Sequence, residues 1–597
     1  MPCAAIPEVQ YSTDPGGRRI MLSLRRCPGL SHFTSNVGVS FKYRIGRCFG
    51  PVRRASWRFP TLGMRASASS DEGLATAAAM ETMRRGGNAM DAIVSMAAAL
   101  NVIQPVACGV GGDCFGVVYE ARTGIVHCVD GSGRSPAALT LQRFQSGHSG
   151  DSVKADCRGI LATVPGVVKA WFETLNFFGS GKLTMAELME PAIRYAEEGF
   201  PVGWSSAAWW GGARRRLAQM HEGSVFLKED GRTPKPGDVF RNVPLARLLK
   251  RIGNEGPEVF YHGDIAESIV QAVSAVGGVM TLDDLQMHMN SAEPVIVPTL
   301  STTYRGRTVH TPPLPSQGAI LLEGLNIMEG FDVRSFKSDP GEFYHLLIEA
   351  LRLAFVDGLS VISDPGFAST DKMINKEYGR KKSCAIDVNK AMMSCAPEGL
   401  PTLRQRGTVT MATADAQGNA CCFISSLGTP CGSTIVRKHG FAVQARAEGF
   451  NMIPGHPNCA GPHKKPYHTL MPVIVTDTAS GKLLAAMGSR AAGAQAQTIL
   501  QVLLAMIDLG LNPQEAVDMP RIKIGGTCST HPDDPIWIEE EMSTAAIESL
   551  IKKGHTIGET LKRHGRSNTG QVHVIAKGNW WDIGASQDRV VNSDVLW

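Results

Sequence analysis

The feature that most constrains this chain is a pair of short apolar segments, TVTMATAD and ACCFISS, joined by the turn sequence AQGN. Strand-favouring residues on either side of a Gly-Asn turn predict a β-hairpin. The first strand starts abruptly at Thr408, directly after Gly407 and a charged, loop-like stretch. Taken alone, Thr408 is explained as an ordinary strand residue, because Thr favours strands.

The rest of the chain places helices before this hairpin and mostly strands after it. Residues 70–105 predict two helices, the first capped by Ser70 and the second beginning near Ala89 and ending before Pro105. Residues 140–406 predict a mostly helical segment that ends in a loop or linker over 373–406. After Thr408, a second hairpin (PVIVTDTASGKLLAAMG), an apolar helix (AQTILQVLLAMIDLG) and further strands follow. This order indicates sheets sandwiched between layers of helices.

Composition excludes several classes of function. The 597 residues are 43% hydrophobic, enough for a core larger than that of one ordinary domain. The net charge of +5, from 60 basic and 55 acidic residues, gives little support to nucleic-acid binding. Because no apolar run is long enough to span a bilayer, we expect a soluble body with no membrane partner. The 14 cysteines contain no C-x-x-C pair, which predicts reduced, buried thiols in an intracellular protein. No metal-ligand cluster has convincing spacing, so we expect no metal and no cofactor.

Residues 1–62 form a separate segment in this interpretation. The acids before Asp71 are Glu8 and Asp14, whereas nine arginines lie between positions 18 and 58. Such a basic leader fits an organellar transit peptide, and equally a disordered extension or a mis-assigned start. A secretory signal is disfavoured because the leader has no continuous apolar segment. The expected location is cytoplasmic or organellar, and the arginines would suit mitochondria.

Ordered matches along the chain from about Gly63 to the C-terminus carry a family resemblance. They are RRGGNAMDAIVSMAAALNVIQP, GVGGDCF, TVPGVVKAW, EPAIRYAEEGFPV, GDVFRN, EGPEVFYHGDIAESIV, GGVMTLDDL, PPLPSQGAILLEGLNIMEGFD, GTVTMATADAQGNA, KPYHTLMPVIV and GASQDR. With these motifs the chain resembles the γ-glutamyltransferase family of N-terminal-nucleophile hydrolases. The resemblance implies an α+β fold, a four-layer αββα sandwich with a helical N-terminal large segment.

The resemblance also implies that the precursor cuts itself. The Thr408 hydroxyl would attack the carbonyl of Gly407, leaving a large subunit (63–407) and a small subunit (408–597) paired as a heterodimer, or as a dimer of heterodimers. The freed α-amino group of Thr408 has a lower pKa than a lysine and would act as a base beside its own hydroxyl. The hydroxyl would then form an acyl-enzyme with a small amide substrate.

Further site residues are implied position by position. Ser426 stands where the family has a second hydroxyl that hydrogen-bonds the nucleophile; its plain alternative is an outward sheet serine. Gly488 and Ser489 stand where the family has a Gly-Gly turn whose N–H groups bind the oxyanion. His468 and Thr469 replace a pair of serines near the substrate, although a lone histidine is usually structural.

The chain departs from glutamyl-specific members at the positions that hold the substrate's charged groups. Ser132 stands in place of the arginine that binds the α-carboxylate, Gly449 in place of an aspartate, and Gly428 in place of an asparagine. An unpaired buried ammonium is costly, so glutathione is not the expected substrate. The motifs DGSGRSP, GGDCF and KPYHTL instead resemble the branch that contains oxamate amidohydrolase.

Arg134 and Arg446 could recognise a small anionic acyl group through bidentate hydrogen bonds, with a surface ion pair as the alternative for each.

Two rival functions stay open: a true γ-glutamyltransferase or glutathione hydrolase, and an uncut, inactive binding protein of the same fold. A nucleotide site at GVGGDC is excluded because Cys114 occupies the third glycine position and the loop precedes a strand.

Overall fold

A computed structural model of the chain describes residues 60–150, 152–333, 340–397, 400, 407–525, 531–578, 581–587 and 595–596. It also describes two paired strands near the N-terminus, β1 (Tyr11–Thr13) and β2 (Arg19–Met21). The chain divides into two compact units, residues 1–48 and 49–597. The predicted leader lies mostly outside the described residues, and everything below concerns the second unit.

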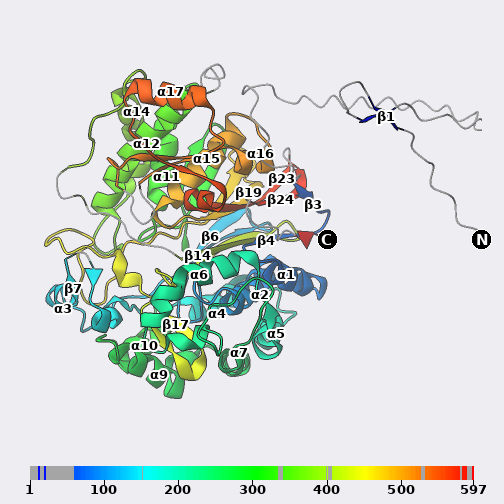
Figure 1. Cartoon of the computed structure of the whole chain (residues 1–597), viewed down its shortest axis with the longest axis vertical. Coiled ribbons are helices and arrows are strands. Elements are labelled where there is room, and N and C mark those ends of the chain that lie inside the picture. The colour runs from blue at the N-terminus through cyan, green and yellow to red at the C-terminus, as the bar shows by residue number, and fades with distance from the viewer. Residues whose placement is uncertain are drawn as a thin grey trace, which may run out of the picture. The chain divides into compact units, whose positions relative to one another are not determined.

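Two seven-stranded antiparallel sheets form the centre of the second unit (Figure 1). The nucleophile sheet, which contains the predicted hairpin, has the order β11 (Ile296–Pro298), β6 (Ile125–Gly131), β5 (Asp113–Glu120), β15 (Ala420–Ser426), β14 (Thr408–Ala414), β4 (Ser67–Ser70) and β25 (Val595–Leu596). The facing sheet has the order β12 (Leu300–Tyr304), β13 (Arg307–Thr311), β18 (Val473–Asp477), β19 (Leu483–Arg490), β23 (Gln571–Gly578), β24 (Trp581–Gln587) and β3 (Thr61–Leu62).

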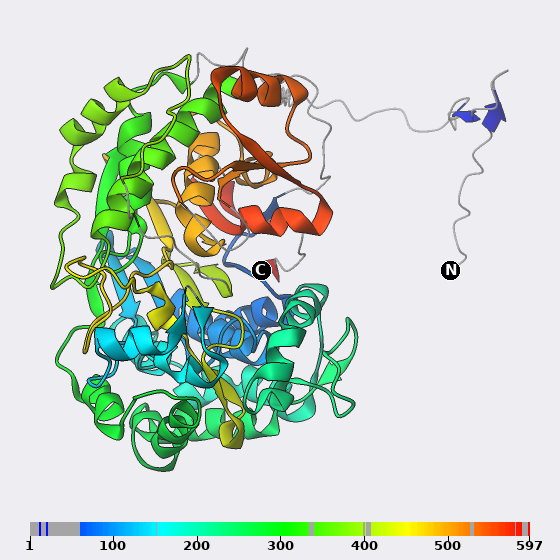
Figure 2. The same ribbon diagram turned by 60° about the vertical axis from the view of Figure 1, so that its left-hand side comes forward.

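Helices cover the outer face of each sheet in both ribbon views (Figures 1 and 2). The helices that follow one another from residue 73 to 290 lie on the side of the nucleophile sheet: α1 (Gly73–Arg84), α2 (Ala89–Ile103), α3 (Leu141–Ser146), α4 (Val167–Phe178), α5 (Met185–Glu198), α6 (Trp204–Gln219), α7 (Val243–Glu255), α8 (Glu258–Tyr261), α9 (Gly263–Ser274) and α10 (Leu282–Asn290). The later helices lie on the side of the facing sheet: α11 (Gly318–Met328), α12 (Pro340–Val361), α13 (Asp371–Ile374), α14 (Lys376–Ala385), α15 (Gln495–Ile507), α16 (Pro513–Asp518) and α17 (Thr544–Lys553). The predicted αββα sandwich is confirmed.

Smaller strands complete the architecture. A three-stranded sheet combines β20 (Ile522–Ile524), β21 (Ile536–Glu539) and β22 (Ile557–Leu561), and three two-stranded ribbons pair β7 (His148–Ser149) with β8 (Ser152–Val153), β9 (Phe200–Pro201) with β10 (Val239–Phe240), and β16 (Thr434–Val436) with β17 (Phe441–Val443).

Three apolar regions hold the four layers together, one between the two sheets and one under each layer of helices. Successive strand residues point to opposite faces, so each central strand contributes to two of these regions. In β15, Cys421 packs toward the helices and Cys422 packs between the sheets, as the sequence predicts for adjacent strand residues. Helix α2 is buried along its whole length, which explains its Ala- and Met-rich composition.

Two local predictions are wrong. Ser70 does not cap α1: it is the last residue of β4, the N-cap position is Glu72, and no side chain caps this helix end. The segment predicted as a linker from Met373 onward contains α14 and the second half of α13. Asn375 caps α14 by accepting a hydrogen bond from the Tyr378 amide, and Lys382 forms ion pairs with Glu323 and Asp357. Tertiary contacts therefore stabilise a helix whose sequence has little apolar periodicity.

Candidate active site

The hairpin places Thr408 and Ser426 opposite each other at one end of two central strands. Strands β14 and β15 pair antiparallel with Thr408 against Ser426 and Ala414 against Ala420. Both hydroxyl-bearing residues are buried, Thr408 with 4% of its surface exposed. The hairpin and its turn therefore agree with the sequence prediction.

The Thr408 side chain faces the space between the two sheets. Ala412 and Ala414, on the same face of β14, belong to the apolar region between the sheets, whereas Val409 and Met411 pack against helices. Because strand residues alternate, Thr408 shares the inner face with the two alanines. A nucleophile here would act in the gap between the sheets.

Gly407 is in a backbone conformation that glycine adopts most easily. Its φ is +88°, in the region that L side chains rarely occupy. A Cβ at this position would also lie 3.3 Å from the Pro430 nitrogen. The peptide bond that is predicted to be cut is therefore held in a special geometry just before the strand begins.

Ser426 hydrogen-bonds the carbonyl of the predicted cleavage site. Its Oγ donates to the Gly407 oxygen at 2.5 Å and accepts from the Gly428 amide at 2.8 Å. The incoming Gly428 bond fixes the hydroxyl so that its own proton points at Gly407. The family resemblance implies a bond from Ser426 to the nucleophile, and the bond found here is to the carbonyl that the nucleophile would attack.

Asp113 extends this row of polar residues onto a third strand. It opposes Ser426 across the β15–β5 pairing and is fully buried. Arg446 binds its carboxylate in bidentate fashion, with both distances 2.7 Å, and His468 Nε2 lies 2.9 Å from Asp113 Oδ2. Two of the predicted substrate-binding residues, Arg446 and His468, are thus brought together by a buried carboxylate beside Ser426.

Electrostatics fixes the charges in this trio. Burial alone would raise the pKa of Asp113, but the charge of Arg446 and the interactions with His468 outweigh burial and lower it to about 2. Burial lowers the pKa of His468, and the Arg446 charge lowers it further. Near pH 7 the group is therefore an ion pair between Asp113 and Arg446 with a neutral imidazole.

Asp113 is a residue of the candidate site that the sequence reasoning missed. Its signal in the sequence was a lone acid at the start of an apolar strand, in GGDCF.

Arg134 belongs to a second charged group. Its guanidinium forms a bidentate pair with Glu293 (3.1 and 3.0 Å) and contacts Asp364 at 2.5 Å. Lys465 bridges Asp130 and the same Glu293. About a third of the Arg134 side chain is exposed, whereas Arg446 is fully buried. Both predicted arginines are therefore engaged by carboxylates of the chain itself.

His468 and Thr469 are fixed by a loop from the other side of the predicted cut. The His468 amide donates to the Pro315 carbonyl at 2.9 Å, and the Thr469 carbonyl accepts from Gln317 Nε2 at 2.6 Å. The Ser316 hydroxyl donates to the Leu470 carbonyl at 2.7 Å. The motifs PPLPSQG and KPYHTL, far apart in sequence, therefore form one buried structure.

Gly488 and Ser489 lie within strand β19 and not in the expected turn. A Cβ on Gly488 would lie 2.4 Å from Thr410 Oγ1 and 2.9 Å from Cys422 Sγ, so the two sheets approach closely here. Pairing of β19 with β18 ends at Met487, while pairing with β23 continues to Arg490. Beyond Met487, a β19 backbone N–H that points toward β18 therefore has no partner in β18. Such an N–H group could donate to an oxyanion.

A second buried polar group lies next to the hairpin, on its β4 side. The Asp71 carboxylate accepts from the Thr410 amide at 2.8 Å and forms an ion pair with Arg490 at 3.2 Å. His573 links Asp71 (3.4 Å) to the Ser69 hydroxyl (2.7 Å). Burial alone would raise the pKa of Asp71, but Arg490 and His573 lower it. This group could not be predicted from the sequence, because its members come from four distant segments.

No helix in the described part of the chain has the length and apolarity needed to cross a membrane.

Comparisons with known proteins agree along most of the chain. The sequence model of the family "Gamma-glutamyltranspeptidase" matches residues 75–594. The glutathione hydrolase-like YwrD proenzyme of Bacillus subtilis (strain 168) is 32% identical over 500 residues, which are 83% of this chain and 92% of that protein. The oxamate amidohydrolase proenzyme of Klebsiella pneumoniae is 29% identical over 492 residues, 81% of this chain and 89% of that protein. The crystal structure of cephalosporin acylase from Bacillus halodurans superposes with a TM-score of 0.81 at 30% identity, covering 91% of this chain and 97% of that one.

The fold and the hairpin define an N-terminal-nucleophile hydrolase, since a buried hydroxyl opens a central strand of an αββα sandwich directly after a glycine. Within that class, the chain belongs to the gamma-glutamyltranspeptidase family. It is an enzyme of the hydrolase and transferase type that this family contains.

Proposed function

We propose that this chain is a proenzyme that cuts itself between Gly407 and Thr408 and then hydrolyses a small, anionic amide. The observation that carries the proposal is the hydrogen bond from Ser426 to the Gly407 carbonyl, with Thr408 as the next residue. A hydroxyl that donates to this carbonyl would stabilise the negative charge that develops on its oxygen during attack.

Self-cleavage would proceed in two steps. The Thr408 Oγ attacks the Gly407 carbonyl carbon, the C–N bond breaks, and the hydroxyl proton moves to the leaving nitrogen, which becomes the α-amino group of Thr408. Water then hydrolyses the Gly407 ester, releasing a carboxylate and restoring the hydroxyl. The product is a heterodimer of residues up to 407 and residues from 408, as the word proenzyme in the relatives' names leads us to expect.

Amide hydrolysis would reuse the same groups. The α-amino group of Thr408, with an ordinary pKa of about 8, would take the hydroxyl proton and pass it to the departing amine. We propose two oxyanion donors: the Ser426 hydroxyl, and the backbone N–H of whichever of Gly488 and Ser489 points away from β23. Neighbouring N–H groups of a strand point to opposite edges, so the other one belongs to the β23 pairing. Water would then cleave the acyl-enzyme, or another amine would accept the acyl group.

The proposed substrate class follows from what the site offers and lacks. Arg134 is the proposed contact for an anionic acyl group because about a third of its side chain is exposed, and His468 and Thr469 are proposed to line the site. Arg446 is fully buried against Asp113. We therefore propose an indirect role for Arg446, which is to hold the Asp113 carboxylate beside Ser426. Oxamate, the substrate in one relative's name, has the proposed chemistry of a small amide with an adjacent carboxylate.

A γ-glutamyl substrate is the second candidate, because other relatives are named glutathione hydrolases, including that of Escherichia coli at 28% identity. Against it, Ser132 holds its side chain on Asp130 at 2.5 Å, and Gly449 carries no charge. Turnover of oxamate and of a γ-glutamyl anilide by the purified protein separates the two candidates. Preference for the anilide would overturn the small-anion proposal while leaving self-cleavage intact.

The deciding experiment is intact mass measurement of wild type beside Thr408→Ala and Thr410→Ala. Thr410 is a matched control, since it is a threonine two residues along the same strand face and does not follow the predicted cut. Wild type and Thr410→Ala should give two fragments, the smaller beginning at Thr408, and Thr408→Ala should stay whole. A folded wild type that remains one chain would contradict the proposal and favour a binding protein of the same fold.

A further inference from the structure

Two histidines and a glutamate meet in a buried cluster away from the hairpin. His345 and Glu349 lie one turn apart on α12, and His555 follows α17. One ligand atom from each lies within 4.8 Å of the others, and all three residues are buried. Among the described residues, no other three His, Cys, Asp or Glu side chains meet this criterion.

The orientation of His345 suits a metal ligand. Its Nε2 lies 2.9 Å from the Asp387 carbonyl, which can only accept, so Nε2 carries the proton. With the proton on Nε2, Nδ1 of the neutral ring presents a lone pair. That lone pair faces His555 Nε2 at 2.7 Å. A backbone carbonyl on the far nitrogen is the usual support of a metal-bound histidine.

Glu349 is also held in place. Its two carboxylate oxygens accept from Arg352 at 3.2 Å and from the Met392 amide at 2.9 Å. Each oxygen keeps a second lone pair for a cation. Because Arg352 balances the charge of Glu349, we expect weaker binding than a site with an unpaired carboxylate would give.

We propose that His345, Glu349 and His555 bind one divalent transition-metal ion of the zinc type. Zinc takes imidazole and carboxylate ligands at about 2.0–2.2 Å, which places tetrahedral ligand atoms about 3.3 Å apart. The two imidazole nitrogens would therefore separate by about 0.6 Å from their present distance. The Nε2 proton of His555 would move to its Nδ1, which has no hydrogen-bond partner among the described residues. The only recorded bond that this tautomer change breaks is the one between His555 and His345, which the ion would replace.

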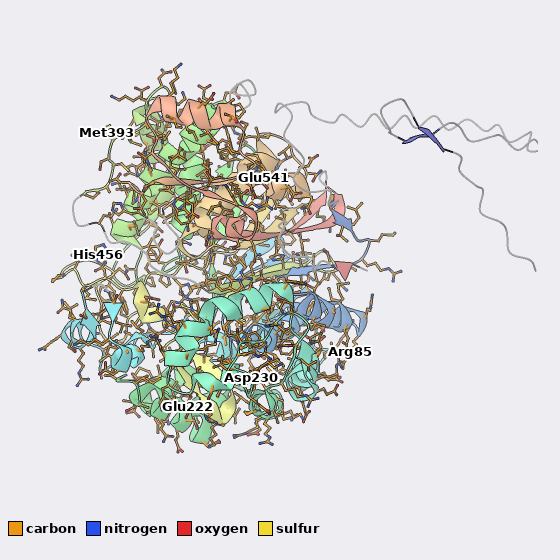
Figure 3. All side chains as sticks on the ribbon, in the orientation of Figure 1. Arg85, Glu222, Asp230, Met393, His456 and Glu541 are labelled. Carbon is orange, nitrogen blue, oxygen red and sulfur yellow. The ribbon has the colours of Figure 1, made fainter. Side chains whose placement is uncertain are left out.

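The ion would join segments on both sides of the proposed cleavage site. His345 and Glu349 precede Gly407, and His555 follows it, 210 positions after His345. Asp387 and Met392, whose backbone groups bond His345 and Glu349, lie in the segment between α14 and the proposed cut. The next residue, Met393, is exposed at the surface of the molecule (Figure 3). The proposal does not rest on self-cleavage, because an uncut chain presents the same ligands.

The test is a titration of the full-length protein, stripped of metal with a chelator, with Co²⁺ and Zn²⁺. Co²⁺ in a low-coordinate nitrogen and oxygen site gives visible absorption, and calorimetry gives the stoichiometry. We expect one ion per chain, and an affinity at least about 100-fold lower in His555→Gln, whose amide can still donate to His345. His310→Gln is the matched control, because His310 bonds two threonine hydroxyls and should leave binding unchanged.

A second variant and a second readout guard against misfolding. The second variant, Glu349→Gln, should weaken Co²⁺ binding. The second readout is the Tm: Zn²⁺ should raise the Tm of wild type and of His310→Gln but not that of His555→Gln. The reason is that an ion that binds only the folded state stabilises it. If wild type binds no ion, or if His555→Gln and Glu349→Gln bind as tightly as wild type, the proposal is overturned. The cluster is then a neutral, hydrogen-bonded histidine pair.

Discussion

At the scale of single residues, the proposed cleavage site combines three features. Gly407 provides the backbone conformation, Thr408 the hydroxyl, and Ser426 a proton donor aimed at the carbonyl. None of these residue types is unusual alone in a β-hairpin. Their combined chemistry depends on the strand register, which pairs Ser426 with Thr408.

Ser426→Ala should slow self-cleavage by about 100- to 1,000-fold, because it removes a donor to the oxygen on which charge develops. The measurement is the rate at which uncut precursor disappears on a denaturing gel. Ser425→Ala is the control, since the Ser425 hydroxyl bonds the Asp113 carbonyl and lies on the opposite face of β15. Equal rates in Ser426→Ala and wild type would remove Ser426 from the mechanism.

Asp113→Asn should lower the free energy of unfolding by about 3–5 kcal/mol, because it leaves the Arg446 charge buried without its partner. Urea unfolding followed by circular dichroism measures this loss. Pairing the change with Arg446→Gln should recover part of it, since the double variant has no unpaired charge. A single variant as stable as wild type would show that the pair contributes little.

The same carboxylate predicts a pH dependence. The pKa of Asp113 is about 2 in the folded chain, below its ordinary value of 3.8, so its contribution is complete above pH 3.8 and is lost as pH falls through 2. The shift corresponds to about 2 kcal/mol. Between pH 5 and pH 2, Asp113→Asn should therefore lose less stability than wild type in urea titrations. Parallel losses in the two proteins would contradict this assignment.

At the scale of elements, the site depends on how closely β19 approaches the hairpin. Gly488 faces Thr410 and Cys422 with no room for a methyl group. The predicted oxyanion donors therefore lie on a strand of the facing sheet, held by pairing with β23. The gap between the sheets is narrow at this end because a glycine is present.

Gly488→Ala should lower the free energy of unfolding by about 1–3 kcal/mol, because the added methyl group overlaps buried side chains. It should also slow self-cleavage by displacing β19 from the hairpin. Denaturant titration and the gel assay measure the two effects. Gly211→Ala in α6, where a Cβ would meet open space, should leave both unchanged or raise stability slightly.

At the scale of the whole molecule, segments from before and after the proposed cut share both sheets. In the nucleophile sheet, β14 and β15 lie between β4 and β5, and in the facing sheet β18 pairs with β13. The two fragments could not separate without breaking central strand pairs and exposing apolar core.

After cleavage, the two fragments should elute together in native size-exclusion chromatography and separate only in denaturant. Uncut Thr408→Ala gives the reference elution volume for the intact chain. Fragments that elute separately from a folded sample would contradict the interleaved arrangement.

The sequence by itself determined the elements and the class. Strand-favouring residues and the turn sequence located the hairpin, and apolar periodicity located the main helices. The ordered motifs identified the family. These signals are either local in the sequence or can be matched position by position. Only the tertiary structure decided which groups meet. It joined Asp113 to Arg446 and His468, Asp71 to Arg490 and His573, and His345 to His555, and it placed Gly488 in a strand. Such contacts depend on the pairing and packing of distant segments, and spacing along one sequence does not record them.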